Sequence, residues 1–68
     1  MLKGFAARLD APIRPSWAGW EVSGVRGRVW VGGGIRGTRT MLWRPDGTRH
    51  TAEGWLSVDE ALAWLESD

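Results

Sequence analysis

Residues 38–51 read TRTMLWRPDGTRHT, and this stretch decides which kind of fold the chain can build. In its central triplet, residues 45–47, proline presets φ at the first turn position, aspartate caps the turn and glycine takes the left-handed site. The runs on either side, residues 38–44 and 48–51, carry several Thr and aromatic residues, which favour strands. The stretch therefore predicts an antiparallel hairpin closed by a three-residue loop.

The sequence before this hairpin also has the texture of β-structure. Val22 and Val25 lead to a glycine, and residues 28–31 then alternate as Arg-Val-Trp-Val before three glycines end the run. Alternation at a period of two is typical of a strand with one buried face. We expect three antiparallel strands in all, with room for a fourth short one.

The alternation also predicts which side chains share a face. Arg28 and Trp30 fall on one side of their strand, with Val29 and Val31 on the other. In the next strand we expect Met41 and Trp43 to join the valines against the core. That choice sends Thr40 and Arg44 to the face of Arg28 and Trp30.

A helix is predicted at the end of the chain. Residues 57–60, Ser-Val-Asp-Glu, form a capping box, in which Ser57 accepts from the Glu60 amide while Glu60 reaches back to the Ser57 amide. One apolar face follows, flanked by Trp64, and it comprises Val58, Ala61, Leu62 and Leu65. Glu66 and Asp68 oppose the helix dipole, so we expect the last turn to fray.

The first residues predict a shorter helix. Leu2, Phe5, Ala6 and Leu9 have the spacing of an amphipathic turn or two, and Pro12 and Pro15 then impose an extended stretch. We expect residues 1–16 to form an N-terminal arm or short helix with a linker, and residues 17–68 to form one βββα domain. The predicted fold class is α+β, a small sheet of three or four antiparallel strands with the C-terminal helix packed on one face.

Composition limits what can stabilise this fold. The chain has 68 residues, no Cys and a single His, so neither disulfides nor a zinc site can supplement a small core. We expect the six Trp residues to supply much of the core, with some of them left exposed for contact with a partner. The sequence has no apolar run long enough to span a membrane and no secretory signal, so we expect a cytoplasmic protein.

Charge is distributed unevenly. The first fifty residues hold nine basic and three acidic side chains, a net charge of +6, whereas the last eighteen hold five acidic and no Lys or Arg. Such polarity is typical of proteins with a charged partner. An alternative explanation is codon usage, because a GC-rich genome favours Arg over Lys in any protein, and this chain has eight Arg and one Lys.

Catalysis is not expected. Residues 32–37 match G-x-G-x-x-G, but another β-type run follows them, so a hairpin turn is favoured over a nucleotide site. His50 is the only imidazole, and Asp59 and Glu60 are occupied at the helix start. We therefore expect no enzyme activity, no catalytic residues, no metal and no cofactor.

Residues 40–65 resemble a known type of DNA-binding domain. A strand, a Pro-Asp-Gly turn, a short strand and then residues 54–65, GWLSVDEALAWL, are similar to the arm-type domain at the N-terminus of tyrosine-family phage integrases and to the plant ethylene-response domain. In both families a three-stranded sheet enters the major groove and a helix braces it from behind. The resemblance implies contacts to DNA by Arg28, Trp30, Arg39 and Arg44, and structural roles for Trp55, Leu62 and Leu65.

Two binding functions remain open on this basis. One is nucleic-acid binding through a basic, Trp-containing sheet face, in which Arg contacts phosphate or guanine and Trp stacks on a base. The alternative is a protein-binding inhibitor or adaptor of phage or mobile-element type that contacts a host protein through exposed Trp and Arg. The sequence also leaves a homodimer open and implies no membrane partner.

Overall fold

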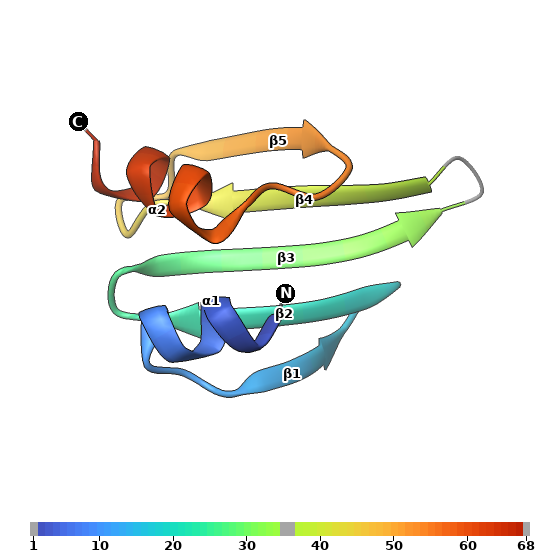
Figure 1. The fold of residues 1–68 in the computed structure, drawn as a ribbon, viewed down its shortest axis with the longest axis horizontal. Coiled ribbons are helices and arrows are strands. Elements are labelled where there is room, and N and C mark those ends of the chain that lie inside the picture. The colour runs from blue at the N-terminus through green and yellow to red at the C-terminus, as the bar shows by residue number, and fades with distance from the viewer. Residues whose placement is uncertain (1, 35–36, 68) are drawn as a thin grey trace.

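Five strands form one antiparallel sheet in the order of the chain (Figure 1). The computed structural model describes residues 2–34 and 37–67. Its elements are α1 (Leu2–Leu9), β1 (Ile13–Ser16), β2 (Gly19–Gly24), β3 (Gly27–Gly34), β4 (Gly37–Trp43), β5 (Arg49–Glu53) and α2 (Val58–Glu66). The predicted α+β class is confirmed, but the sheet is wider than the three or four strands expected. The strand that sequence patterning missed is β1, in residues expected to be a linker.

The hairpin between β4 and β5 has the predicted loop. The Arg44 amide donates to the Thr48 carbonyl at 2.9 Å, so three residues separate this closing pair. Gly47 has φ +94°, the left-handed conformation that the turn requires. The Asp46 carboxylate accepts from the Thr48 amide at 2.8 Å, and this hydrogen bond lowers the pKa of Asp46 below its ordinary value.

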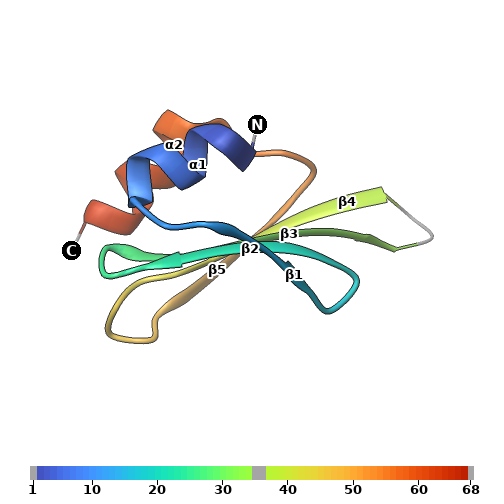
Figure 2. The same cartoon turned by 90° about the horizontal axis from the view of Figure 1, so that it is seen from below.

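Both helices pack on the same side of the sheet, which leaves the opposite side bare (Figure 2). The predicted cap of α2 is present, because the Ser57 hydroxyl accepts from the Glu60 amide at 3.1 Å. The return contact differs from the expected one, since Glu60 accepts from the Ser57 hydroxyl at 3.0 Å. The helices lie over one end of the sheet, near the β2–β3 turn, and the β3–β4 end extends beyond them (Figure 1).

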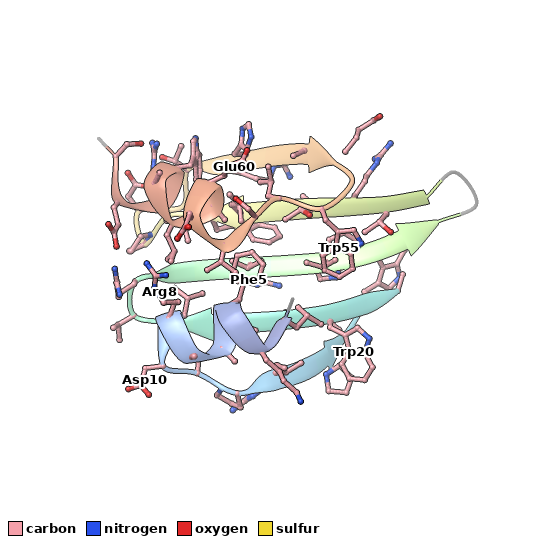
Figure 3. The ribbon with its side chains drawn as sticks, viewed as in Figure 1. Phe5, Arg8, Asp10, Trp20, Trp55 and Glu60 are labelled. Atoms are coloured by element: carbon pink, nitrogen blue, oxygen red, sulfur yellow. The ribbon has the colours of Figure 1, made fainter. Side chains whose placement is uncertain are left out.

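No tryptophan is among the fully buried residues of the core between helices and sheet in the described part of the chain, and Trp64 packs only against the edge of that core. Its buried apolar members are Phe5, Leu9, Val22, Val29, Val31, Leu42, Ala61, Leu62 and Leu65. Phe5 projects from α1 into the space between the two helices and the sheet (Figure 3). The expectation that Trp supplies the core is therefore wrong: one aromatic and several aliphatic side chains fill the small volume that two short helices can cover.

The side chains of β4 that point to the core are the opposite set from the predicted one. Leu42 lies beside Val29 and Thr40 beside Val31, so Thr40 and Leu42 point to the core. Met41 and Trp43 lie beside Trp30 and Arg28 on the other face. The adjacent run Met41-Leu42-Trp43 puts apolar side chains on both faces, so alternation alone cannot decide which face is buried.

A buried threonine explains how the core accepts a polar residue in β4. The Thr40 hydroxyl donates to the Gly54 carbonyl at 2.7 Å, and the Gly54 amide donates to the Thr38 carbonyl at 2.7 Å. These two bonds attach the β5–α2 connection to β4 and satisfy a side chain with no exposed surface.

Nothing in the described residues forms a helix that is both long and apolar enough to cross a membrane.

We predict that Thr40→Val lowers the free energy of unfolding by about 1 kcal/mol, because the Gly54 carbonyl loses its hydroxyl donor. Urea unfolding followed by circular dichroism measures the change. Thr38→Val is the matched control, since Thr38 makes no side-chain hydrogen bond in the described structure and should lose less than about 0.5 kcal/mol. Equal losses in the two variants would contradict the role given to Thr40.

Candidate functional site

The face of the sheet that the helices leave bare is called here the open face. In each strand the residues that point to the helices alternate with residues that point to the open face, and the strand pairing brings the second set together on one side of the sheet. They are Arg14, Ser16, Gly19, Glu21, Ser23, Arg28, Trp30, Gly32, Arg39, Met41, Trp43, Arg49, Thr51 and Glu53. The two central strands, β3 and β4, contribute the indoles and the methionine, so the middle of the open face is aromatic and apolar.

The open face carries a modest positive charge. Four arginines and two glutamates lie on it, which gives a net charge of +2 among the described residues. The acidic helix α2 lies on the other side of the sheet, where Asp59 pairs with Arg8 at 3.4 Å and Glu66 pairs with Arg26. Negative charge therefore collects on the helix side, partly neutralised, and away from the open face.

Arg28 is held in place by two neighbours. Its Nε donates to the Glu21 carboxylate at 2.8 Å, and its guanidinium carbon lies 4.5 Å from the centre of the Trp43 ring. Glu21, Arg28 and Trp43 come from three adjacent strands. A guanidinium fixed in this way keeps its terminal nitrogens for a ligand and loses little entropy on binding.

The Trp30 indole lies over the strand that carries it. A Cβ atom added to Gly32 would come within 2.3 Å of the Trp30 ring, so the glycine leaves the space that the indole occupies. The Trp30 Nε1 donates to the Trp17 carbonyl at 3.0 Å, which fixes the ring edge. The indole is half-buried, and its position is set by β3 and by the β1–β2 turn together.

That turn presents a second indole. Trp17 and Ala18 form the two-residue connection between the paired residues Ser16 and Gly19, and Trp17 is 84% exposed. Ala18 has φ +56°, a left-handed conformation that costs a non-glycine residue of the order of 1 kcal/mol. The chain tolerates this strain in the turn that holds the Trp17 carbonyl against Trp30.

The two indoles line a hollow that opens on this face, called here the aromatic hollow. Its volume is about 830 Å³, and its wall includes Trp17, Trp30, Met41, Arg39 and Glu53. Flat apolar surface, a guanidinium and a carboxylate thus surround one space. Such a wall can stack a planar ring and offer charged hydrogen-bonding groups to its edge.

Arg44 does not belong to the open face, contrary to the prediction. Its Nε donates to the Trp64 carbonyl at 3.1 Å, and a terminal nitrogen donates to the Ser67 hydroxyl at 2.8 Å. Its guanidinium carbon also lies 4.0 Å from the centre of the Trp64 ring. Arg44 therefore occupies the C-terminal end of α2, where a cation suits the helix dipole, and α2 continues to Glu66 despite its acidic last turn.

The structure brings together three of the four residues singled out from the sequence. Arg28, Trp30 and Arg39 share the open face, although the expected alternation of β4 would have put Arg39 on the other side, and their binding role stays a prediction. Sequence reasoning missed Trp17, Met41 and Trp43, of which the last two were placed in the core. Their apolar character pointed to burial, and only strand pairing shows that they face outward.

The glycine-rich stretch is part of the sheet. Residues 32–34 belong to β3 and Gly37 begins β4, so the G-x-G-x-x-G match lies in two paired strands. Residues 35 and 36 of the expected turn lie outside the described residues. The Trp30 ring over Gly32 gives a local reason for a glycine at that position.

A second, smaller hollow lies on the helix side of the sheet. It measures about 230 Å³ and is bordered by Trp20, Val31, Thr38 and Trp55. Trp20 and Trp55 are 49% and 48% exposed, and both lie beyond the ends of the helices (Figure 3). No charged residue borders this hollow among the described part of the chain, so the two hollows differ in chemistry.

Comparison of the chain with protein-family models, with curated proteins and with solved structures finds no match.

We predict that Gly32→Ala lowers the free energy of unfolding by about 1 to 3 kcal/mol, because the new methyl group meets the Trp30 ring and the Ala18 carbonyl oxygen. The Trp30 indole N–H resonance should move with the displaced ring. Gly33→Ala is the matched control, since its Cβ would meet no atom closer than 3.5 Å. A Gly32→Ala variant as stable as Gly33→Ala would contradict the proposed position of Trp30.

Proposed function

We propose that this chain is a non-catalytic module that binds single-stranded nucleic acid on the open face of its sheet. The observation that carries the proposal is the aromatic hollow, in which Trp17 and Trp30 stand beside Met41 and Arg39. Single-stranded nucleic acids bind to proteins by stacking bases on aromatic side chains while arginines contact the phosphates. The open face supplies both kinds of group within one surface.

The width of the sheet favours a single strand over a duplex. Five strands about 4.8 Å apart extend over roughly 19 Å, whereas the major groove of B-DNA is about 12 Å wide. A three-stranded sheet of the arm type can enter that groove, but this five-stranded sheet is too wide to enter it face-on. A flexible single strand can instead lie across β3 and β4 and place its bases on the exposed indoles.

The charges assign roles to individual arginines. Arg39 borders the aromatic hollow, and Arg28 lies two open-face pairs further along β3 and β4, where it stands beside Trp43. Arg14 lies on β1 next to Glu21. We assign phosphate contacts to these three residues and base stacking to Trp17 and Trp30.

The alternative is protein binding through the helix side. Its specific support is the uncharged hollow bordered by Trp20 and Trp55, because partly exposed tryptophans next to apolar surface are typical of protein interfaces. The two functions use different tryptophans, so substitutions can separate them.

We predict that a labelled single-stranded 20-mer binds the chain at low salt, as measured by fluorescence anisotropy. Three or four phosphate contacts should weaken binding about 20- to 50-fold between 50 and 200 mM salt, from a slope of about 0.7 per contact. A duplex of the same sequence should bind less tightly. The absence of single-strand binding at 50 mM salt would end this proposal.

We predict that Trp17→Ala weakens this binding by about 5- to 150-fold, the loss of one stacked base. Trp20→Ala is the matched control, because Trp20 is also exposed but lies on the helix side. Arg39→Ala should weaken binding and reduce the salt slope, whereas Arg8→Ala on α1 removes the same charge with a smaller effect. Equal effects of Trp17→Ala and Trp20→Ala would contradict the use of the open face.

A further inference from the structure

The two edges of the sheet differ in their capacity to pair with another strand. Edge strand β1 spans Ile13–Ser16 and contains Pro15, which has no amide hydrogen to donate. Edge strand β5 spans Arg49–Glu53, contains no proline, and is exposed along almost its whole length. No other element lies beyond β5 in the described structure (Figure 1). The edge at β5 is therefore the one that can accept a further strand.

The hydrogen bonds at both ends of β5 show which of its backbone groups point outward. The Arg44 amide bonds to the Thr48 carbonyl and the Gly54 amide bonds to the Thr38 carbonyl, and both pairs continue the β4–β5 register. In an antiparallel ladder hydrogen-bonded pairs alternate with pairs that are not bonded to each other. The bonded residues of β5 are thus 50 and 52, and Arg49, Thr51 and Glu53 direct their amides and carbonyls to the free edge.

The outward residues form a self-complementary set. Arg49 and Glu53 lie on the open face at opposite ends of β5, with Thr51 midway between them. Neither charge joins an ion pair within the described part of the chain. In an antiparallel copy of the same strand centred on Thr51, each Arg49 stands opposite a Glu53.

We propose that β5 pairs antiparallel with β5 of a second copy of this chain, about a two-fold axis that passes midway between the two Thr51 residues. The pairing joins the outward amides and carbonyls of Arg49, Thr51 and Glu53 in about six backbone hydrogen bonds. It places two Arg49–Glu53 pairs across the new ladder, at the short separation that directly opposite residues have. The result is one continuous sheet with a doubled open face.

Charge selects this register and this partner. A parallel pairing in register would set Arg49 against Arg49 and Glu53 against Glu53, and a shift of the antiparallel pairing by two residues would leave charges without opposite partners. On the helix side of the sheet the proposed register sets His50 opposite Ala52, a large side chain against a small one. A second copy satisfies all of these conditions with no other component, and the inference stands independently of nucleic-acid binding.

Sedimentation equilibrium of the full chain tests the proposal. The wild-type chain should show a monomer–dimer equilibrium with Kd below about 1 mM. Arg49→Glu alone and Glu53→Arg alone should each weaken the dimer by about tenfold or more, because two attractive pairs become repulsive. An equimolar mixture of the two variants should regain an affinity within about threefold of wild type, since every pair across the ladder is again of opposite charge.

A control mixture separates specific pairing from general attraction between oppositely charged proteins. Lys3→Glu changes the net charge as Arg49→Glu does, but on α1, so it should dimerise like the wild type. In the mixed dimer of Lys3→Glu with fluorescently labelled Glu53→Arg, only one of the two pairs across the ladder is of opposite charge. Followed through the label, this mixed dimer should be weaker than the mixed dimer of Arg49→Glu with labelled Glu53→Arg.

Thr51→Pro tests the backbone contacts directly. The Thr51 amide does not bond to β4 in the alternation described above, so proline at this edge position should abolish dimerisation while circular dichroism shows a retained fold. A wild-type chain that is monomeric at 1 mM would overturn the proposal. So would a labelled Glu53→Arg variant that binds Arg49→Glu no more tightly than it binds Lys3→Glu.

Discussion

The structure depends on one constraint: two short helices have to bury one face of a five-stranded sheet, and they are too short to cover all of it. Helices α1 and α2 reach only the end of the sheet near the β2–β3 turn, and their apolar residues meet Val22, Val29 and Leu42 there. A domain of this size buries a smaller fraction of its surface than a larger domain does, and no second layer covers the other face within the described residues. The helix-covered end holds the core, and every other part of the sheet is left to solvent or to a partner.

This constraint explains why the tryptophans are outside. A core bounded by two helices of eight and nine residues accommodates Phe5 and aliphatic side chains, and the indoles lie around it on the open face, in the β1–β2 turn, beyond the helix ends and on α2. Several are held by specific contacts, such as the bond from the Trp30 Nε1 to the Trp17 carbonyl and the approach of Arg44 to Trp64. Exposed indoles fixed in this way form preorganised surface, which lowers the entropy lost on binding.

Features that depend on a few neighbouring residues could be predicted from the sequence, whereas features that depend on strand pairing could not. The capping residue Ser57, the turn glycine Gly47 and the spacing of Phe5 and Leu9 each specify their own few residues, and the structure has them as predicted. Which β4 side chains point to the core depends on the register of β4 with β3, and the apolar run 41–43 leaves that choice undetermined. The helix-capping role of Arg44 depends in turn on the face of β4 on which Arg44 lies and on where α2 ends. No pattern near residue 44 could reveal either. The aromatic hollow was partly foreseen through Trp30 and Arg39, but Trp17 joins it only because β1 exists.

The central claim is that ligand binds on the open face and not on the helix side. Each of the six tryptophans carries one indole N–H, so a two-dimensional NMR titration of the 15N-labelled chain with a single-stranded oligonucleotide reports on both faces at once. We predict that the indole resonances of Trp17, Trp30 and Trp43 shift while those of Trp20, Trp55 and Trp64 stay in place. Shifts confined to Trp20 and Trp55, with Trp17 and Trp30 unchanged, would contradict it.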